Sequence, residues 1–203
     1  MKLLLSSAGF ENPKIGKKFL EVVVKPAHDI RIIFIPTAAI TEEEKYYVKK
    51  CKDELLGVGI KSQNIKILNL DHSISYSEVA DSDVIYVCGG NTFHLLDRVR
   101  KTGFDRVIKQ FLEEDKVYIG VSAGSILMGP NIEITKLGDK DICFVTDFTG
   151  LGYTNTAITP HYNKKEHKKV EKFKKKADYP ILPLTDKQAL LILGNKKEII
   201  EWN

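Results

Sequence analysis

Cysteine is scarce in this chain: there are three in 203 residues, and no two of them form a Cys-x-x-Cys pair. Cys51, Cys88 and Cys143 are an odd number without the spacing of metal ligands, which argues against a disulfide framework and against a zinc site. We therefore expect each to be a small buried residue or a free thiol. We also expect the protein to use no metal and no other cofactor.

Long hydrophobic runs are missing as well. No apolar stretch approaches the roughly 20 residues that a membrane-spanning helix needs. The apolar residues near the start are too few for a signal peptide, and a charged segment follows them, so we expect residues 3–6 to form a strand. The sequence thus predicts a cytoplasmic protein with no membrane partner.

Positive charge is concentrated in one segment. The formal net charge is +4, and residues 163–176 are rich in lysine. Val170 and Phe173, three residues apart, favour an amphipathic surface helix whose lysines face solvent. A nucleic-acid patch is the alternative, but no aromatic interleaving or nucleic-acid fold signature accompanies the lysines. We expect no nucleic-acid partner. Because this helix begins just after His161, its lysines could instead influence a nearby substrate site.

What is present is a regular alternation of strand and helix patterns. Thr41 with Glu44 predicts a capping box at the start of one helix. Buried strands that alternate with helices indicate an α/β fold, a doubly wound, mostly parallel sheet sandwiched by helices, and residues 1–203 fit a single domain. The expected strands are 3–6, 29–35, 64–70, 84–88 and 116–119, then short ones at 181–183, 189–193 and 198–202; the expected helices are 15–25, 42–56, 92–100 and 104–114.

Gly120-Val121-Ser122-Ala123-Gly124 is the most informative motif. It lies between an expected strand and a helix, as a nucleophile elbow does. A Cβ at Gly120 or Gly124 would crowd the neighbouring backbone. The motif therefore predicts Ser122 as a nucleophile and the N–H of Ala123 as an oxyanion donor. An ordinary serine in a glycine-flanked turn is the alternative.

A serine nucleophile needs a base, and a carboxylate to orient that base. Among five histidines, His161 stands out, because it follows an apolar run and Pro160 on a loop of the kind that often carries function. A structural loop histidine is the alternative. Asp186, at the edge of an expected strand, is our candidate for the orienting carboxylate. The competing carboxylates are Asp139, Asp141, Asp147, Glu166, Glu171 and Asp178.

A glycine pair, Gly89-Gly90, follows another strand and precedes a helix. A phosphate-binding loop would fit that position, but the segment lacks the Gly-Lys-Ser/Thr ending of such loops. Ligands of open α/β sheets bind beyond the carboxyl ends of the strands, so the pair and Ser122 should share one crevice. We expect one glycine N–H of this loop to complete an oxyanion hole with the N–H of Ala123.

Three motifs in this order, 88–96, 120–124 and 159–162, resemble the peptidase E family of serine peptidases, which includes the α-aspartyl dipeptidases and has cyanophycinases as relatives. The resemblance implies a fold similar to class I glutamine amidotransferases (flavodoxin-like), a Ser122–His161–Asp186 triad, and oxyanion donors at Gly90 and Ala123. It also implies that Asp139, or less directly Asp141, holds the α-amino group of a short peptide substrate or serves as an alternative triad acid.

The chain departs from that family in the helix after the histidine. Aspartyl dipeptidases carry arginines there, whereas this chain has Lys164, Lys165, Lys168 and Lys169. Lysine lacks the bidentate fork of arginine, so we expect a dipeptidase or exopeptidase without an assured preference for N-terminal aspartate. A hydrolase of non-peptide esters or amides, or a non-catalytic module that binds a small metabolite, are the alternatives. We expect a monomer or a homodimer.

Overall fold

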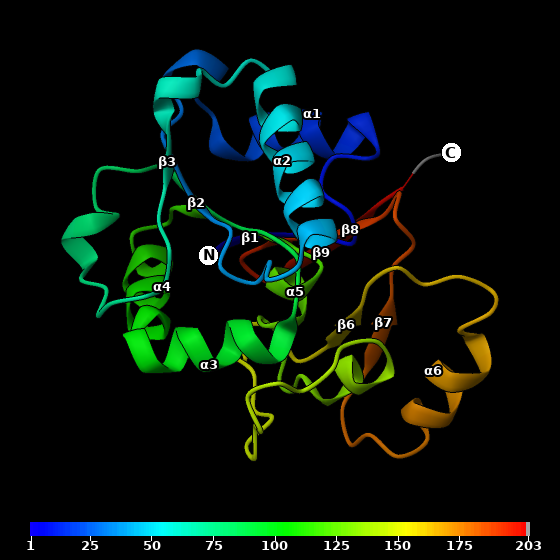
Figure 1. The fold of residues 1–203 in the computed structure, drawn as a ribbon. Coiled ribbons are helices and arrows are strands. Elements are labelled where there is room, and N and C mark those ends of the chain that lie inside the picture. Colours follow the sequence, from blue (N-terminus) through cyan, green and yellow to red (C-terminus); the bar gives the residue numbers. More distant parts are fainter. Residues whose placement is uncertain (202–203) are drawn as a thin grey trace.

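A seven-stranded sheet lies at the centre of the computed structural model, which describes residues 1–201 (Figure 1). The strand order is β3-β2-β4-β5-β1-β8-β9. Five of these strands are parallel: β1 (Lys2–Ser6), β2 (Ile32–Ile35), β3 (Ile65–Ile67), β4 (Val84–Val87) and β5 (Val117–Val121). Strand β8 (Ala189–Leu193) runs antiparallel to β1, and β9 (Lys196–Ile200) runs antiparallel to β8. The predicted doubly wound, mostly parallel sheet is confirmed.

Both faces of the sheet are buried, which explains why the strands read as continuous apolar runs. Leu4 and Phe34 belong to the core beneath α1 (Pro13–Val23) and α2 (Glu42–Gly57). Leu5 and Ile33 belong to the core on the other face. That face is covered by α3 (Thr92–Thr102), α4 (Phe104–Glu113) and the short α5 (Ala123–Ile126) (Figure 1).

Local sequence signals account for most of the helix boundaries. The Oγ1 of Thr41 accepts from the N–H of Glu44, whose carboxylate accepts from the N–H of Thr41, so the predicted capping box is confirmed. Helix α1 ends earlier than expected, because Val24 adopts a left-handed C-cap with φ 56°. Strands β2 and β3 begin later than expected, because 3-10 turns occupy Ala27–Asp29 and Ser62–Asn64.

A second, two-stranded sheet lies beside the main one and was not foreseen from the sequence. Strand β6 (Ala157–Thr159) pairs in parallel with β7 (Ile181–Pro183), and α6 (His167–Lys174) lies between them in the chain (Figure 1). Helix α6 is shorter than the lysine-rich segment, but it buries Val170 as predicted. The final strand begins at Lys196, and Trp202, which we placed in it, lies outside the described residues.

Within residues 1–201, no helix has both the length and the apolar character that crossing a membrane requires. The three cysteines are free, with Cys51 and Cys88 buried and Cys143 half-buried.

Candidate active site

Ser122 occupies a sharp turn between β5 and α5. Its backbone has φ 48° and ψ −107°, a conformation that residues with a side chain rarely adopt. A Cβ at Gly120 would overlap the carbonyl group of Gly124, and a Cβ at Gly124 would overlap the carbonyl oxygen of Val87. The two glycines therefore let the helix approach the strand closely, which confirms the steric reason inferred from the sequence.

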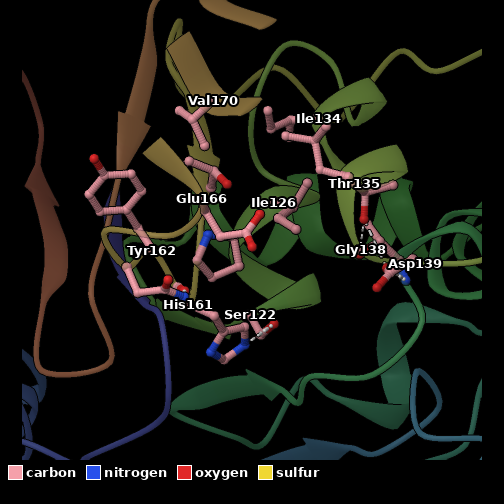
Figure 2. A pocket seen from close by; sticks show the side chains of 15 residues that line it. Ser122, Ile126, Ile134, Thr135, Gly138, Asp139, His161, Tyr162, Glu166 and Val170 are labelled. Carbon is pink, nitrogen blue, oxygen red and sulfur yellow. Dashed lines mark hydrogen bonds between the residues drawn. The ribbon is translucent and has the colours of Figure 1, made fainter. Parts of the chain in front are cut away.

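His161 joins two side chains that are distant in the sequence. Its Nε2 lies 2.9 Å from the Oγ of Ser122 (Figure 2), and its Nδ1 lies 2.6 Å from Oδ1 of Asp186. An ionised carboxylate can only accept, so Nδ1 carries the proton and Nε2 is left to accept from the serine hydroxyl. The structure thus places these three side chains in the order that nucleophilic catalysis by serine requires.

Asp186 lies in the turn between β7 and β8, not at a strand edge as expected. The hydrogen bond from His161 lowers the pKa of Asp186, outweighing the partial burial that raises it. Because the pKa lies below the usual carboxyl range, Asp186 is ionised at neutral pH. A charged partner is what an imidazolium forming at His161 would need.

Sequence reasoning missed Ser7, which supports both His161 and Asp186. Its side chain is fully buried, and its Oγ donates to Oδ1 of Asp186 at 3.0 Å. The same Oγ accepts from the backbone N–H of His161 at 2.7 Å. A signal was available, because Ser7 directly follows β1, the strand beside β5, and neighbouring parallel strands end at the same edge of a sheet.

The loop that carries Gly89 and Gly90 abuts Ser122. A Cβ at Gly89 would lie 3.0 Å from the Cβ of Ser122, and a Cβ at Gly90, where φ is 137°, would overlap the backbone of Ala38. The loop therefore lies against Ser122, although neither glycine is among the described residues that line the pocket beside it. The role of the N–H groups of Gly90 and Ala123 as an oxyanion hole stays a prediction.

A pocket opens beside Ser122 and His161, and Asp139 lines it (Figure 2). Oδ2 of Asp139 accepts from the N–H of Thr92 at 2.7 Å and from the hydroxyl of Thr135 at 2.8 Å. These two donors hold the carboxylate in place without using its other oxygen. Asp139 is therefore in the pocket but is not the hydrogen-bond partner of His161.

The remaining candidate carboxylates differ in their positions relative to this pocket and in their hydrogen-bond partners. Glu166 lines the same pocket, between the loop after His161 and α6. Asp141 accepts from the backbone N–H groups of Cys143 and Val145, so it stabilises its own loop. Two more are engaged in ion pairs with basic side chains: Asp147 pairs with Arg100, and Glu171 pairs with Lys174.

Comparison with known proteins gives a consistent result. The model of peptidase family S51 matches residues 3–200. An uncharacterized peptidase of Pasteurella multocida is 34% identical over 179 residues, which cover 85% of each chain. Peptidase E of Shewanella amazonensis is 35% identical over 161 residues, 79% of this chain and 66% of the relative. A crystal structure of a candidate peptidase E from Listeria monocytogenes superposes with a TM-score of 0.82 at 28% identity, covering 100% of this chain and 98% of that one.

Proposed function

The chain belongs to peptidase family S51 and is a peptidase, and from that premise we propose that it is a serine dipeptidase or exopeptidase that cleaves short peptides. The observation that carries the proposal is the continuous hydrogen-bonded line from Ser122 through His161 to Asp186, at 2.9 and 2.6 Å. Ser122 and His161 border a pocket whose other lining residues come from several elements of the fold (Figure 2).

The proposed reaction has two halves. Oγ of Ser122 attacks the scissile carbonyl carbon while Nε2 of His161 takes the hydroxyl proton, and the N–H groups of Gly90 and Ala123 stabilise the oxyanion. The C–N bond then breaks, and His161 gives its proton to the leaving amine. Water attacks the acyl-enzyme with His161 again as base, which releases the acid and restores Ser122.

Asp139 supports an exopeptidase rather than an endopeptidase. It places a negative charge in the same pocket as Ser122, where a free N-terminal ammonium is a suitable partner. We assign it to that role, with Asp141 outside the site.

We further propose a cytoplasmic monomer or homodimer that binds neither nucleic acid nor membranes. Free cysteines suit the reducing conditions of that compartment.

A fluorophosphonate label tests the proposal directly. An activated serine forms a stable covalent phosphonyl adduct, so intact mass spectrometry should show one adduct on the wild-type protein and none on Ser122→Ala. The same adduct with hydrolysis of esters but of no peptide would favour a non-peptide hydrolase. Absence of labelling on folded protein, with no turnover of any dipeptide, would favour the metabolite-binding module and overturn the proposal.

Replacing Ser7 by alanine should lower kcat by about tenfold and leave KM nearly unchanged. The substitution leaves the partly buried N–H of His161 without its acceptor, a loss of about 1 kcal/mol, and removes one donor from Asp186. Steady-state kinetics on a dipeptide measure the effect. The matched control is Ser6→Ala, because Ser6 is equally buried but its hydroxyl makes only a 3.5 Å contact. Equal losses in both variants would show that Ser7 matters only for folding.

A further inference from the structure

The pocket beside Ser122 has the opposite charge to the protein as a whole. The chain carries a formal net charge of +4. Among the 15 described residues that line the pocket, two are acidic, Asp139 and Glu166, and none is lysine or arginine. The lysines of the segment after His161 are exposed at positions 164, 165, 168 and 169, and the structure does not bring them into the pocket. The positive charge expected near the substrate from the sequence is therefore absent from this lining.

Part of the pocket wall is hydrocarbon. Ile126, Ile134 and Val170 line it, and these residues are 5%, 2% and 2% exposed. Figure 2 shows Glu166 beside Val170 and Ile126, and Asp139 beside Thr135 on the other side of the pocket. A long side chain that enters between these apolar residues would have its hydrocarbon stem packed and its end near the carboxylate of Glu166.

We propose that this pocket selects a substrate whose N-terminal residue is lysine or arginine, and that Glu166 is the residue that determines this specificity. The inference rests on the proposed function above. The aliphatic stem of such a side chain matches the apolar wall, its cation matches Glu166, and its α-ammonium matches Asp139. An acidic side chain would instead meet two carboxylates, so N-terminal aspartate is disfavoured.

Glu166 already has one partner, and that partner is replaceable. Nζ of Lys169 lies 3.3 Å from Oε2 of Glu166, three residues along the chain, and the two side chains are 59% and 35% exposed. Exposed pairs of this kind contribute little, because solvent screens them and two long side chains must be ordered to form them. A substrate cation that is partly shielded by the apolar wall can therefore displace Lys169.

The test compares three dipeptides, Lys-Ala, norleucyl-Ala and Asp-Ala, on the wild-type enzyme and on Glu166→Gln. Norleucine has the hydrocarbon stem of lysine without its charge. We expect kcat/KM for Lys-Ala to exceed that for norleucyl-Ala by about tenfold, which corresponds to the net free energy of one charge-assisted hydrogen bond. The lowest kcat/KM is expected for Asp-Ala. Glu166→Gln should lower the ratio of kcat/KM for Lys-Ala to that for norleucyl-Ala by about tenfold, which removes the preference for lysine.

Glu171→Gln is the matched control. Glu171 lies in α6, which Glu166 immediately precedes, and like Glu166 it pairs with a lysine three residues along the chain, Lys174 at 2.8 Å, but it does not line the pocket. It should leave the Lys-to-norleucine ratio unchanged. As a second measurement on the unmodified enzyme, added salt should raise KM for Lys-Ala more than for norleucyl-Ala, because screening weakens the pair with Glu166.

The outcomes separate this inference from the proposed function. Turnover that favours Asp-Ala, or a Lys-to-norleucine ratio that neither Glu166→Gln nor salt alters, overturns the specificity while leaving the serine peptidase intact. Failure to cleave any of the three dipeptides, together with the absence of a fluorophosphonate adduct, overturns the proposed function itself. Preference for Lys-Ala that is lost only in Glu166→Gln supports both.

Discussion

Replacing Ser122 by alanine should reduce kcat on the best dipeptide substrate by about a millionfold, the loss seen when a serine protease loses its nucleophile. The reason is covalent: without Oγ no acyl-enzyme forms, and the proton acceptor at His161, 2.9 Å away, has no proton to take. Single-turnover hydrolysis, with the enzyme in large excess over the dipeptide, measures the residual rate. Calorimetric titration with the same dipeptide should show nearly unchanged binding, since the pocket is otherwise intact.

Ser125→Ala is the control for that experiment. Ser125 follows the elbow closely, and its buried hydroxyl lies 2.7 Å from the carbonyl oxygens of both Ser6 and Gly120. Its loss should lower the free energy of unfolding by about 1 kcal/mol without abolishing turnover. Turnover by Ser122→Ala at the wild-type rate would show that the nucleophile is elsewhere.

Replacing Asp186 by asparagine should reduce kcat by about ten-thousandfold, the effect known for the equivalent change in a serine protease triad. The asparagine amide can donate to Nδ1 of His161, which moves the ring proton to Nε2. Nε2 then points a proton at Ser122 and cannot act as its base. Initial rates between pH 5 and 9, analysed for kcat and KM separately, measure the effect.

The contribution of Asp186 to catalysis should be lost as the pH falls, not as it rises. The pKa of this carboxyl is lowered in the folded protein by the hydrogen bond from His161. A depressed pKa means that the charged interaction is complete at neutral pH and is lost only as the pH falls through that lowered value. The asparagine variant should therefore differ most from wild type at neutral pH, where Asp186 is fully ionised.

Asp139→Asn is the contrasting variant. Asp139 hydrogen-bonds to Thr92 and Thr135 rather than to His161. Its neutralisation should raise KM for peptides with a free N-terminus and change kcat far less. A collapse of kcat in Asp139→Asn, with Asp186→Asn near wild type, would reverse our assignment of the orienting carboxylate.

Some of the molecule could be predicted from short stretches of sequence. The capping box of Thr41 and Glu44 is a contact within one helical turn, and the elbow glycines act within a few residues of Ser122. The continuous apolar strands report burial on both faces, which restricts the fold to a helix-covered sheet. Such features were predictable because their physical causes are local or follow from residue periodicity.

Other features depend on contacts that no local pattern contains. The pairing of β6 with β7 outside the main sheet was not foreseen, since either short strand could have joined any edge. Ser7 lies 154 residues from His161, and although its position after β1 places it at the same sheet edge as Ser122, no local pattern shows that it contacts His161 or Asp186. The lysines after His161 were visible in the sequence, but only the folded structure shows that Glu166, just before α6, lines the pocket and that these lysines do not.

The alternation of strands and helices, the sharp turn at Ser122 and the choice of His161 among five histidines could be predicted from residue patterns alone. Which carboxylate meets that histidine depends on how the chain folds. The loop after β6 and the turn before β8 meet because β6 pairs with β7 while β8 returns beside β1, which brings Asp186 within 2.6 Å of His161. Several aspartates had the right chemistry, and distance in the folded chain distinguished them.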